Sequence, residues 1–168
     1  GRTSLLTAAA LSGLLSSVLG DWVNMVNAPI SARERGIRVQ ETTTTGEGEK
    51  YTSLIRLRVD GEKGGISVAG AIFGKREARI VEIDGISVEA IPKGNLLILW
   101  NYDKPGLVGS IGTTLGKNGI NIGQLQFGRE DQGGRAVTII NVDSGPDDST
   151  IAQLEALPNV VSVHKALL

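Results

Sequence analysis

Amide and carboxylate side chains gather around one loop, Asn101-Tyr102-Asp103-Lys104-Pro105-Gly106, and Asn121 follows later in the chain. A free amino acid is a zwitterion, so its site needs an acceptor for the ammonium and N–H donors for the carboxylate. Asp103 offers the acceptor, Asn101 and Asn121 offer amides, and a helix expected from Gly106 offers backbone N–H groups. These residues favour an amino-acid clamp. Two simpler roles stay open, because Asp103 can cap the helix and Asn121 can satisfy a turn.

A second candidate site consists of three cations on a short connection, Lys75, Arg76 and Arg79. Several cations close together can hold a phosphorylated anion through charge-assisted hydrogen bonds. The alternative is an ordinary solvated loop, in which the three charges serve no ligand.

The remaining catalytic and cofactor signatures are missing from the sequence. There is no Cys, which excludes thiol nucleophiles, thiolate zinc sites and iron–sulfur clusters and favours a reducing, cytoplasmic compartment. The single His, His164, falls in an expected strand with no Ser-rich elbow, so we expect a structural role for it. Gly46-x-Gly48 has Tyr51 where a third glycine would fall. The segment 116–119 ends a helix, which is the wrong end for phosphate. We therefore expect no catalytic residue, no metal site and no NAD site in this chain.

Composition limits the partners. The 168 residues carry 17 Lys and Arg against 18 Asp and Glu, a formal net charge of -1. Nucleic-acid binders need a dense basic surface, so no nucleic-acid partner is expected. With 40% hydrophobic and 21% charged residues, the chain can bury the core of one domain or of two small ones.

The chain begins at Gly1 without a Met, which suggests processing or, as we favour, a fragment of a longer protein. Arg2 and the apolar stretch 5–19 have some likeness to a signal peptide, and the stretch is shorter than the ~20 residues of a membrane span. Helical spacing instead predicts an amphipathic helix and no membrane partner. Its expected apolar stripe is Leu11, Leu14, Leu15, Val18, Trp22 and Val26.

The first half of the chain reads as helices followed by hairpins. We expect one or two helical turns over 30–35 ended by Gly36, and extended chain over 37–45, which ends in four β-prone Thr, before a break at Gly46-Glu47-Gly48-Glu49. Alternating apolar residues predict a strand over 55–59 with one buried and one wet face. Further strands are expected over 66–72, 81–83 and 86–88, the last two joined by a tight Asp84-Gly85 turn.

From Pro92-Lys93-Gly94 onward the pattern changes to alternating strands and helices. Strands are expected over 96–100, 122–129, 136–142 and 160–163, and helices from about 107 to 115 and from 146 to 157. We expect the first helix to be started by Asp103 and Pro105 and the second by Pro146, Asp147 and Asp148. This βαββαβ order predicts a sheet with two helices on one face and the other face open. Open sheet faces and edges tend to pair with a second copy of the chain, so a homo-oligomer is expected. The contact would form through the sheet edge or through the helix face on which Gly109, Gly112 and Gly116 allow close approach.

Two groups of segments resemble known families. The segment 101–106 with Gly119-Ile120-Asn121-Ile122, on the βαββαβ frame, is similar to the ACT domain, a regulatory amino-acid-binding module. Val26-Asn27-Ala28-Pro29, Ala32-Arg33-Glu34-Arg35-Gly36 and 70–85 resemble the C-terminal regulatory part of long-form D-3-phosphoglycerate dehydrogenases. The resemblance implies an α+β chain of two small α/β sandwich domains. These are an intervening, allosteric substrate-binding domain over 1–92 and a ferredoxin-like ACT domain over 95–168.

The resemblance also implies a function. That family of oxidoreductases oxidises 3-phosphoglycerate with NAD in the first committed step of serine biosynthesis, and many members are inhibited by L-serine bound between paired ACT domains. By position, L-serine would contact Asn101, Asp103 and Asn121, while Arg79 matches a basic position for phosphorylated anions. The catalytic and NAD-binding domains would lie N-terminal to this chain in the parent protein.

Two other classes stay open beside this one. The chain could be a purely structural oligomerisation module, or it could belong to the regulatory part of an iron–sulfur L-serine dehydratase. The Asn-Ala-Pro and Ala-Arg-Glu-Arg-Gly segments favour the dehydrogenase.

Overall fold

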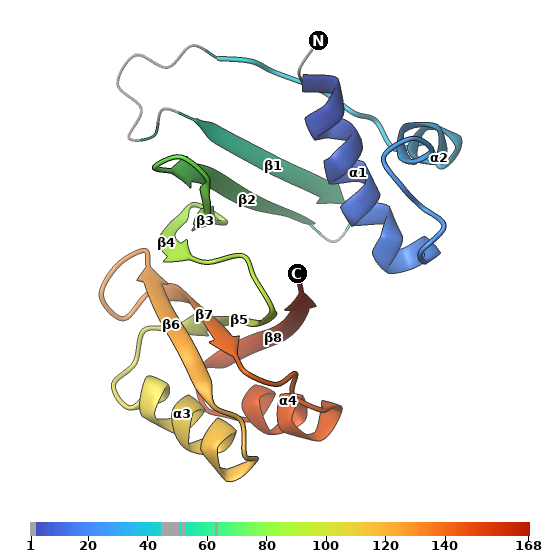
Figure 1. Cartoon of the computed structure of the whole chain (residues 1–168). Helices are drawn as coiled ribbons and strands as arrows, with labels where there is room; N and C mark the ends of the chain where they lie inside the picture. The colour runs from blue at the N-terminus through green and yellow to red at the C-terminus, as the bar shows by residue number, and fades with distance from the viewer. Residues whose placement is uncertain (1–2, 45–50, 52, 63) are drawn as a thin grey trace. The chain divides into compact units, whose positions relative to one another are not determined.

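The computed structural model describes residues 3–44, 51, 53–62 and 64–168 (Figure 1). The chain forms two compact units, residues 1–49 and 50–168. Over the described residues, the first unit holds the helices α1 and α2, and the second holds the strands β1–β8 with the helices α3 and α4. Two antiparallel sheets with separate helices make this an α+β protein, as the sequence predicted.

Both predicted helices of the first unit are confirmed. The helix α1 spans Thr3–Leu19 and α2 spans Ala28–Glu34. Pro29 stands in the first turn of α2, where its missing N–H costs no helical hydrogen bond. Gly36 follows α2 with a φ of 71°, the left-handed conformation that suits glycine. Residues 37–44 form neither helix nor strand, and Thr45 and the break at Gly46–Glu49 lie outside the described residues.

The predicted apolar stripe of α1 is only half right. Leu11 and Leu15 are buried, whereas Leu14 is 38% and Val18 80% exposed. Trp22 and Val26, which follow the helix, are exposed as well. The stripe was wrong because the core of the unit forms on a narrower face of α1, against small residues of α2 and the turn before it. This core contains Leu11, Leu15, Val23, Ala28 and Ala32.

The second unit opens with a sheet of successive hairpins in the order β1-β2-β3-β4. The strands span Leu54–Gly61, Gly64–Phe73, Glu77–Ile83 and Ile86–Ala90. Asp84 and Gly85 join β3 to β4 with φ of 49° and 82°, and Ile83 pairs directly with Ile86. The predicted two-residue turn is therefore confirmed, because both central residues take the positive φ that such a turn needs.

The prediction of a buried apolar face on the first of these strands is wrong. On β1, Ile55, Leu57 and Val59 are 45%, 41% and 40% exposed. They alternate as a strand requires, but β1 is an edge strand and the buried cluster of this sheet lies elsewhere. That cluster consists of Ala69, Ala71 and Val81.

The second sheet has the predicted βαββαβ order. Its elements are β5 (Asn95–Tyr102), α3 (Leu107–Lys117), β6 (Ile122–Arg129), β7 (Arg135–Val142), α4 (Asp148–Glu155) and β8 (Val160–Leu167). The strands are antiparallel in the order β6-β7-β5-β8, the ferredoxin-like arrangement. The apolar run 96–100 lies in the central strand β5, and His164 lies in β8 as expected.

Helices α3 and α4 lie side by side on one face of this sheet (Figure 1). Leu107, Ile111 and Leu115, spaced four apart, place one side of α3 in the core. The second helix begins as predicted, because the Asp147 carboxylate accepts a hydrogen bond from the Thr150 N–H at 2.7 Å. The core beneath the helices comprises Leu97, Leu99, Leu107, Ile111, Leu115, Ile120, Ile140, Val142, Leu154 and Val163.

The other face of the second sheet is not left open, and that prediction is wrong. The hairpin β3–β4 packs against it, and Gly128 on β6 makes the close approach possible. A methyl group at Gly128 would overlap the Ser87 carbonyl oxygen and lie 2.7 Å from Val88 Cγ1. The resulting second core comprises Ile83, Ile86, Val88, Ala90, Leu96, Val137 and Ile139.

The connection between the two sheets is held by hydrogen bonds. The amide of Asn141 donates to the carbonyl oxygens of Ile91 and Lys93 at 3.1 and 3.0 Å. Gly94 and Leu168 exchange two backbone hydrogen bonds of 3.0 Å. The connection is therefore tied to the second sheet at both ends. A domain boundary between residues 92 and 95 stays a prediction.

Candidate amino-acid-binding site

Asn101 stands near the end of β5 and is only 2% exposed. Its Oδ1 accepts a hydrogen bond from Thr138 Oγ1 at 2.8 Å, and its Nδ2 donates to the Tyr102 carbonyl oxygen at 3.3 Å. Buried amides need such partners, and these two hold the side chain in one orientation.

Asp103 follows β5, and its carboxylate is held through one oxygen. Arg129 Nη1 and the Gly133 N–H donate to Oδ2 at 2.6 and 3.2 Å, while Oδ1 has no partner among the described residues. The hydrogen bond from Arg129, and then that from Gly133, lower the pKa of Asp103 below its ordinary value. The group is therefore ionised at neutral pH, with one oxygen available to a ligand.

Asp103 does not cap α3, so that simpler role is wrong. The N-cap position is Gly106 with a φ of 87°, and no side chain accepts from the first turn of the helix. The first N–H groups of a helix carry a partial positive charge, so this uncapped end can receive a carboxylate.

Asn121 is exposed and lies between α3 and β6. Its Nδ2 donates to Asp143 Oδ2 at 2.8 Å, and the Asp143 N–H donates to the Asn121 carbonyl oxygen at 3.1 Å. The side chain thus serves a contact between two loops, and its Oδ1 has no hydrogen bond among the described residues.

The structure does not bring the three residues together within one chain. Asn101 on β5 and Arg129 on β6 both pair with Ala136 of β7, which places them at one end of the sheet. Asn121 directly precedes Ile122, and both Ile122 and Asn95 pair with Val142 of β7, at the other end. The 11 residues of α3 also separate them by about 16 Å at 1.5 Å per residue. One chain therefore presents two half-sites rather than a complete clamp.

The second predicted site is spread along the β2–β3 hairpin. Arg79 is committed to its own strand, with Nη2 2.9 Å from Glu77 Oε2 and Nη1 donating to the Ala78 carbonyl oxygen at 3.0 Å. Lys75 and Arg76 are exposed in the turn. Phosphorylated-anion binding by these three cations stays a prediction.

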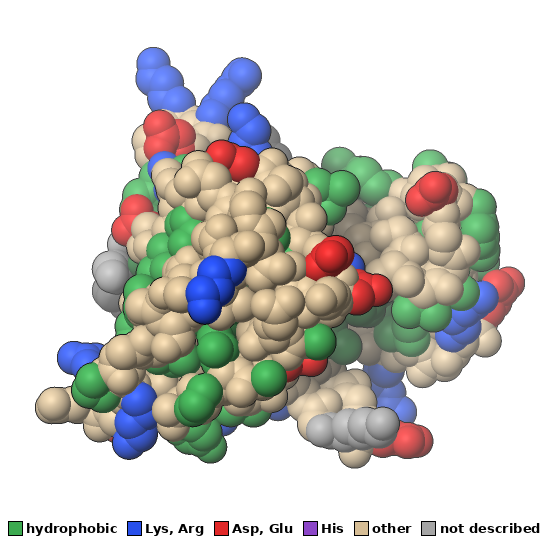
Figure 2. All heavy atoms as spheres, turned by 90° about the horizontal axis from the view of Figure 1, so that it is seen from below, with side chains coloured by type: hydrophobic (Ala, Val, Ile, Leu, Met, Phe, Trp, Pro, Cys, Tyr) green, Lys and Arg blue, Asp and Glu red, His purple; other side chains and the backbone are tan. Residues whose placement is uncertain are grey.

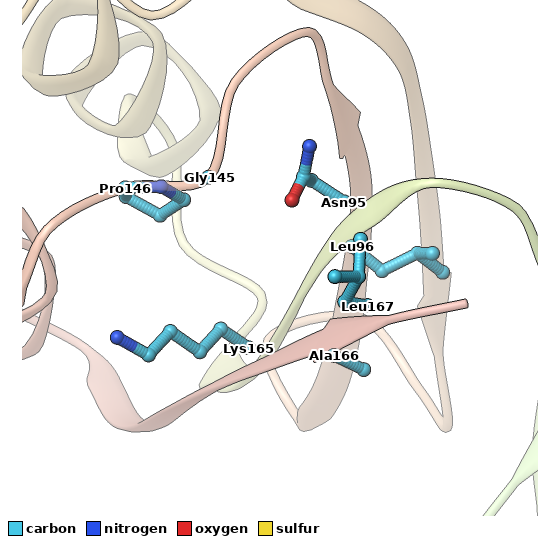
Figure 3. Close-up of a pocket in the computed structure, with 7 residues that line it drawn as sticks. All are labelled: Asn95, Leu96, Gly145, Pro146, Lys165, Ala166 and Leu167. Atoms are coloured by element: carbon cyan, nitrogen blue, oxygen red, sulfur yellow. The ribbon is translucent and has the colours of Figure 1, made fainter.

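A hollow of about 270 Å³ lies between the start of β5, the end of β8 and the Gly145-Pro146 loop (Figure 3). Its charged side chain is Lys165, which is drawn pointing toward that loop, and Lys165 Nζ lies 2.7 Å from Asp148 Oδ1. Because this cation is already paired and the other side chains are mostly apolar, the hollow offers little to orient a charged ligand.

Other ligand classes find little support in the described ranges. No group of three His, Asp or Glu side chains is placed to hold a metal ion there, and no helix is long and apolar enough to cross a membrane. On the face shown in Figure 2, acidic and basic side chains of the described residues are interspersed, without a broad patch of one sign.

The fold of residues 95–168 is the ferredoxin-like fold of an ACT-type domain, and residues 95–159 match the ACT domain family. Residues 2–84 match the D-3-phosphoglycerate dehydrogenase intervening domain. Among similar proteins, the D-3-phosphoglycerate dehydrogenase of Methanocaldococcus jannaschii is 39% identical over 162 residues, 96% of this chain and 30% of the relative. That of Bacillus subtilis is 35% identical over 96% of this chain and 31% of the relative.

The chain belongs to the D-3-phosphoglycerate dehydrogenase family, of which it carries the intervening and ACT domains. It spans about 30% of the length of the relatives it matches. These matches favour the dehydrogenase interpretation over the dehydratase.

The partners of the predicted residues were missed from the sequence. Arg129, Gly133 and Asp143 orient the half-sites, yet each is at least 20 residues from its partner in the chain. The sequence predicts that strands 122–129 and 136–142 pair as neighbours, and this pairing alone could have indicated at which end of the sheet Arg129 lies. It could not have indicated which acid Arg129 contacts, because that depends on the neighbouring strand β5.

Proposed function

We propose that this chain is the allosteric regulatory part of an NAD-dependent, cytoplasmic D-3-phosphoglycerate dehydrogenase of serine biosynthesis, and that its paired ACT domains bind L-serine. The NAD and substrate sites would belong to catalytic domains elsewhere in the parent protein. The observation that carries the proposal is the division of the clamp, with Asn101 and Asp103 at one end of the second sheet and Asn121 at the other.

A second copy completes the site. In a symmetric dimer, each half-site faces its complement, so two equivalent clamps form together. Asp103 Oδ1 would accept from the ammonium of L-serine, and Asn121 of the partner subunit would donate to its carboxylate or accept from its hydroxyl. The uncapped first turn of α3 would add N–H groups for the carboxylate.

A clamp across two chains makes binding depend on their relative arrangement. A ligand shifts a conformational equilibrium only through its different affinities for the two states, typically by ~1–3 kcal/mol. L-serine would thus act by coupling, without touching a catalytic group.

The test is a calorimetric titration of the chain with L-serine. Asp103→Ala should weaken binding about tenfold or more, because the ammonium loses a charge-assisted hydrogen bond. Asp131→Ala, an exposed acid of the neighbouring turn, is the matched control, and Arg79→Ala tests the other site. Unchanged affinity in Asp103→Ala, or loss only in Arg79→Ala, would place the effector elsewhere.

Mixing two variants tests the division between subunits. Asp103→Ala and Asn121→Ala chains should each bind L-serine poorly, but a re-equilibrated equal mixture should regain about a quarter of the wild-type sites, since each mixed dimer has one intact clamp. No recovery in mixtures shown by sedimentation to contain dimers would contradict a shared clamp.

A further inference from the structure

A hollow of about 140 Å³ lies where the turn between β3 and β4 meets the end of β5. At ~30 Å³ per water it has room for a few waters or one small molecule, well below the ~300–1,000 Å³ of drug-sized sites. Asn101 turns its side chain to Thr138, whereas Trp100, its neighbour on β5, turns to the opposite face. The residues that give the hollow its chemistry are Asp84, Ile86, Trp100, Tyr102 and Arg135.

Asp84 brings a partly buried carboxylate to this hollow. Its Oδ1 accepts from the Ser67 N–H at 2.7 Å, and its Oδ2 accepts from Trp100 Nε1 at 3.1 Å. Among the described residues, no Lys, Arg or His nitrogen pairs with it within 4.0 Å. Each carboxylate oxygen can accept a further hydrogen bond, so Asp84 is suited to receive a cation.

Aromatic rings stand beside that carboxylate. The Trp100 ring is held by Asp84 and by His164, whose ring packs edge-on at a centroid distance of 5.3 Å. Tyr102 is 45% exposed at the same end of β5. Both rings line the hollow and can pack against the apolar part of a ligand.

Arg135 supplies the opposite charge. Its Nε and Nη2 bind Glu130 at 3.1 and 2.6 Å, and its Nη1 has no partner in the described part of the chain. The hydrogen bond to Glu130 is the main cause that raises the pKa of Arg135. The negative charge of Asp84 raises this pKa further. An anion and a cation close enough to interact therefore line the same small hollow.

We propose that this hollow binds a small α-amino acid as a zwitterion, with its ammonium on Asp84, its carboxylate on Arg135 and its side chain against Trp100 and Ile86. Asn101 lines the hollow as well, but this site differs from the L-serine clamp because it needs neither Asp103 nor a second copy. Its size limits the ligand to the smallest amino acids.

The experiment uses Trp100 as its own reporter. The chain has two tryptophans, so Trp22→Phe leaves Trp100 alone. Titration with L-alanine should then change the fluorescence saturably at millimolar concentration, whereas propionate and ethylamine, which each lack one charge, should not. No saturable change up to about 50 mM L-alanine, or an equal response to propionate, would overturn the proposal.

Variants separate this site from the clamp. Arg135 is exposed, so Arg135→Gln should leave the fold intact while weakening the L-alanine response about tenfold or more. Arg33→Gln, an exposed arginine of α2, is the matched control and should not change the response. A response that persists in Arg135→Gln but is lost in Asp103→Ala would assign L-alanine to the clamp and refute the second site.

Discussion

Replacing Gly128 with Ala should disturb the packing between the two sheets of the second unit. The added methyl would overlap the Ser87 carbonyl oxygen and lie 2.7 and 3.0 Å from side-chain carbons of Val88 and Ile86. The nearest obstacle is backbone, which cannot turn away as the tip of a side chain can. The strand β4 must therefore shift as a whole.

The expected cost follows from two limits. Overfilling a packed core typically costs about 1–3 kcal/mol. Complete separation would expose Ile83, Ile86 and Val88, which are 3%, 2% and 9% exposed, at about 1.5–3 kcal/mol each. Since a local shift of β4 costs less than separation, we expect Gly128→Ala to lower the free energy of unfolding by about 1–3 kcal/mol.

Urea unfolding followed by Trp100 fluorescence in the Trp22→Phe background measures this change. With a slope of about 2 kcal/mol per M, the midpoint should fall by roughly 0.5–1.5 M. The control is Gly123→Ala on the same strand, where the new methyl would meet Asn141 and Asp143 only at 3.5 and 3.6 Å. If both variants unfold at the same midpoint, the two sheets are not packed as described.

Three further variants test other contacts of the second unit. Asn141→Ala removes both hydrogen bonds to the connection 91–94 and should lower the free energy of unfolding by about 1–3 kcal/mol in the same urea assay. Asp147→Ala removes the N-cap of α4 and should lower the melting temperature more than the control Asp148→Ala, whose carboxylate is 97% exposed. The pKa of Asp103 is lowered in the folded chain, so the ionised carboxylate stabilises the fold at every pH above its ordinary pKa of about 4. This stabilisation is lost as the pH falls through the lower pKa of the folded state. Asp103→Asn should therefore show a shallower loss of stability between about pH 4 and pH 2 than the wild type, and equal slopes would argue against the ion pair.

Local patterns in the sequence predicted most of the elements. Asp84-Gly85 predicted its turn because a positive φ is a property of those two residues, and Asp147 predicted the start of α4 because capping is a contact with the next turn. Asn101, Asp103 and Asn121 were chosen by their chemistry, but the sequence could not indicate that one chain holds them at opposite ends of a sheet.

The sequence by itself determined the order of strands and helices, the turns between them and the absence of thiol chemistry, because these depend on residue type and on neighbours a few positions away. Only the tertiary structure decided which faces are covered. Gly128 admits β4 onto the face that periodicity left open, while the apolar face of β1 stays exposed. Tertiary structure also decided that Arg129 holds Asp103, because that contact joins residues 26 apart through the register of three strands. Periodicity tells which side chains share a face, but only the packing of distant segments determines what lies against it.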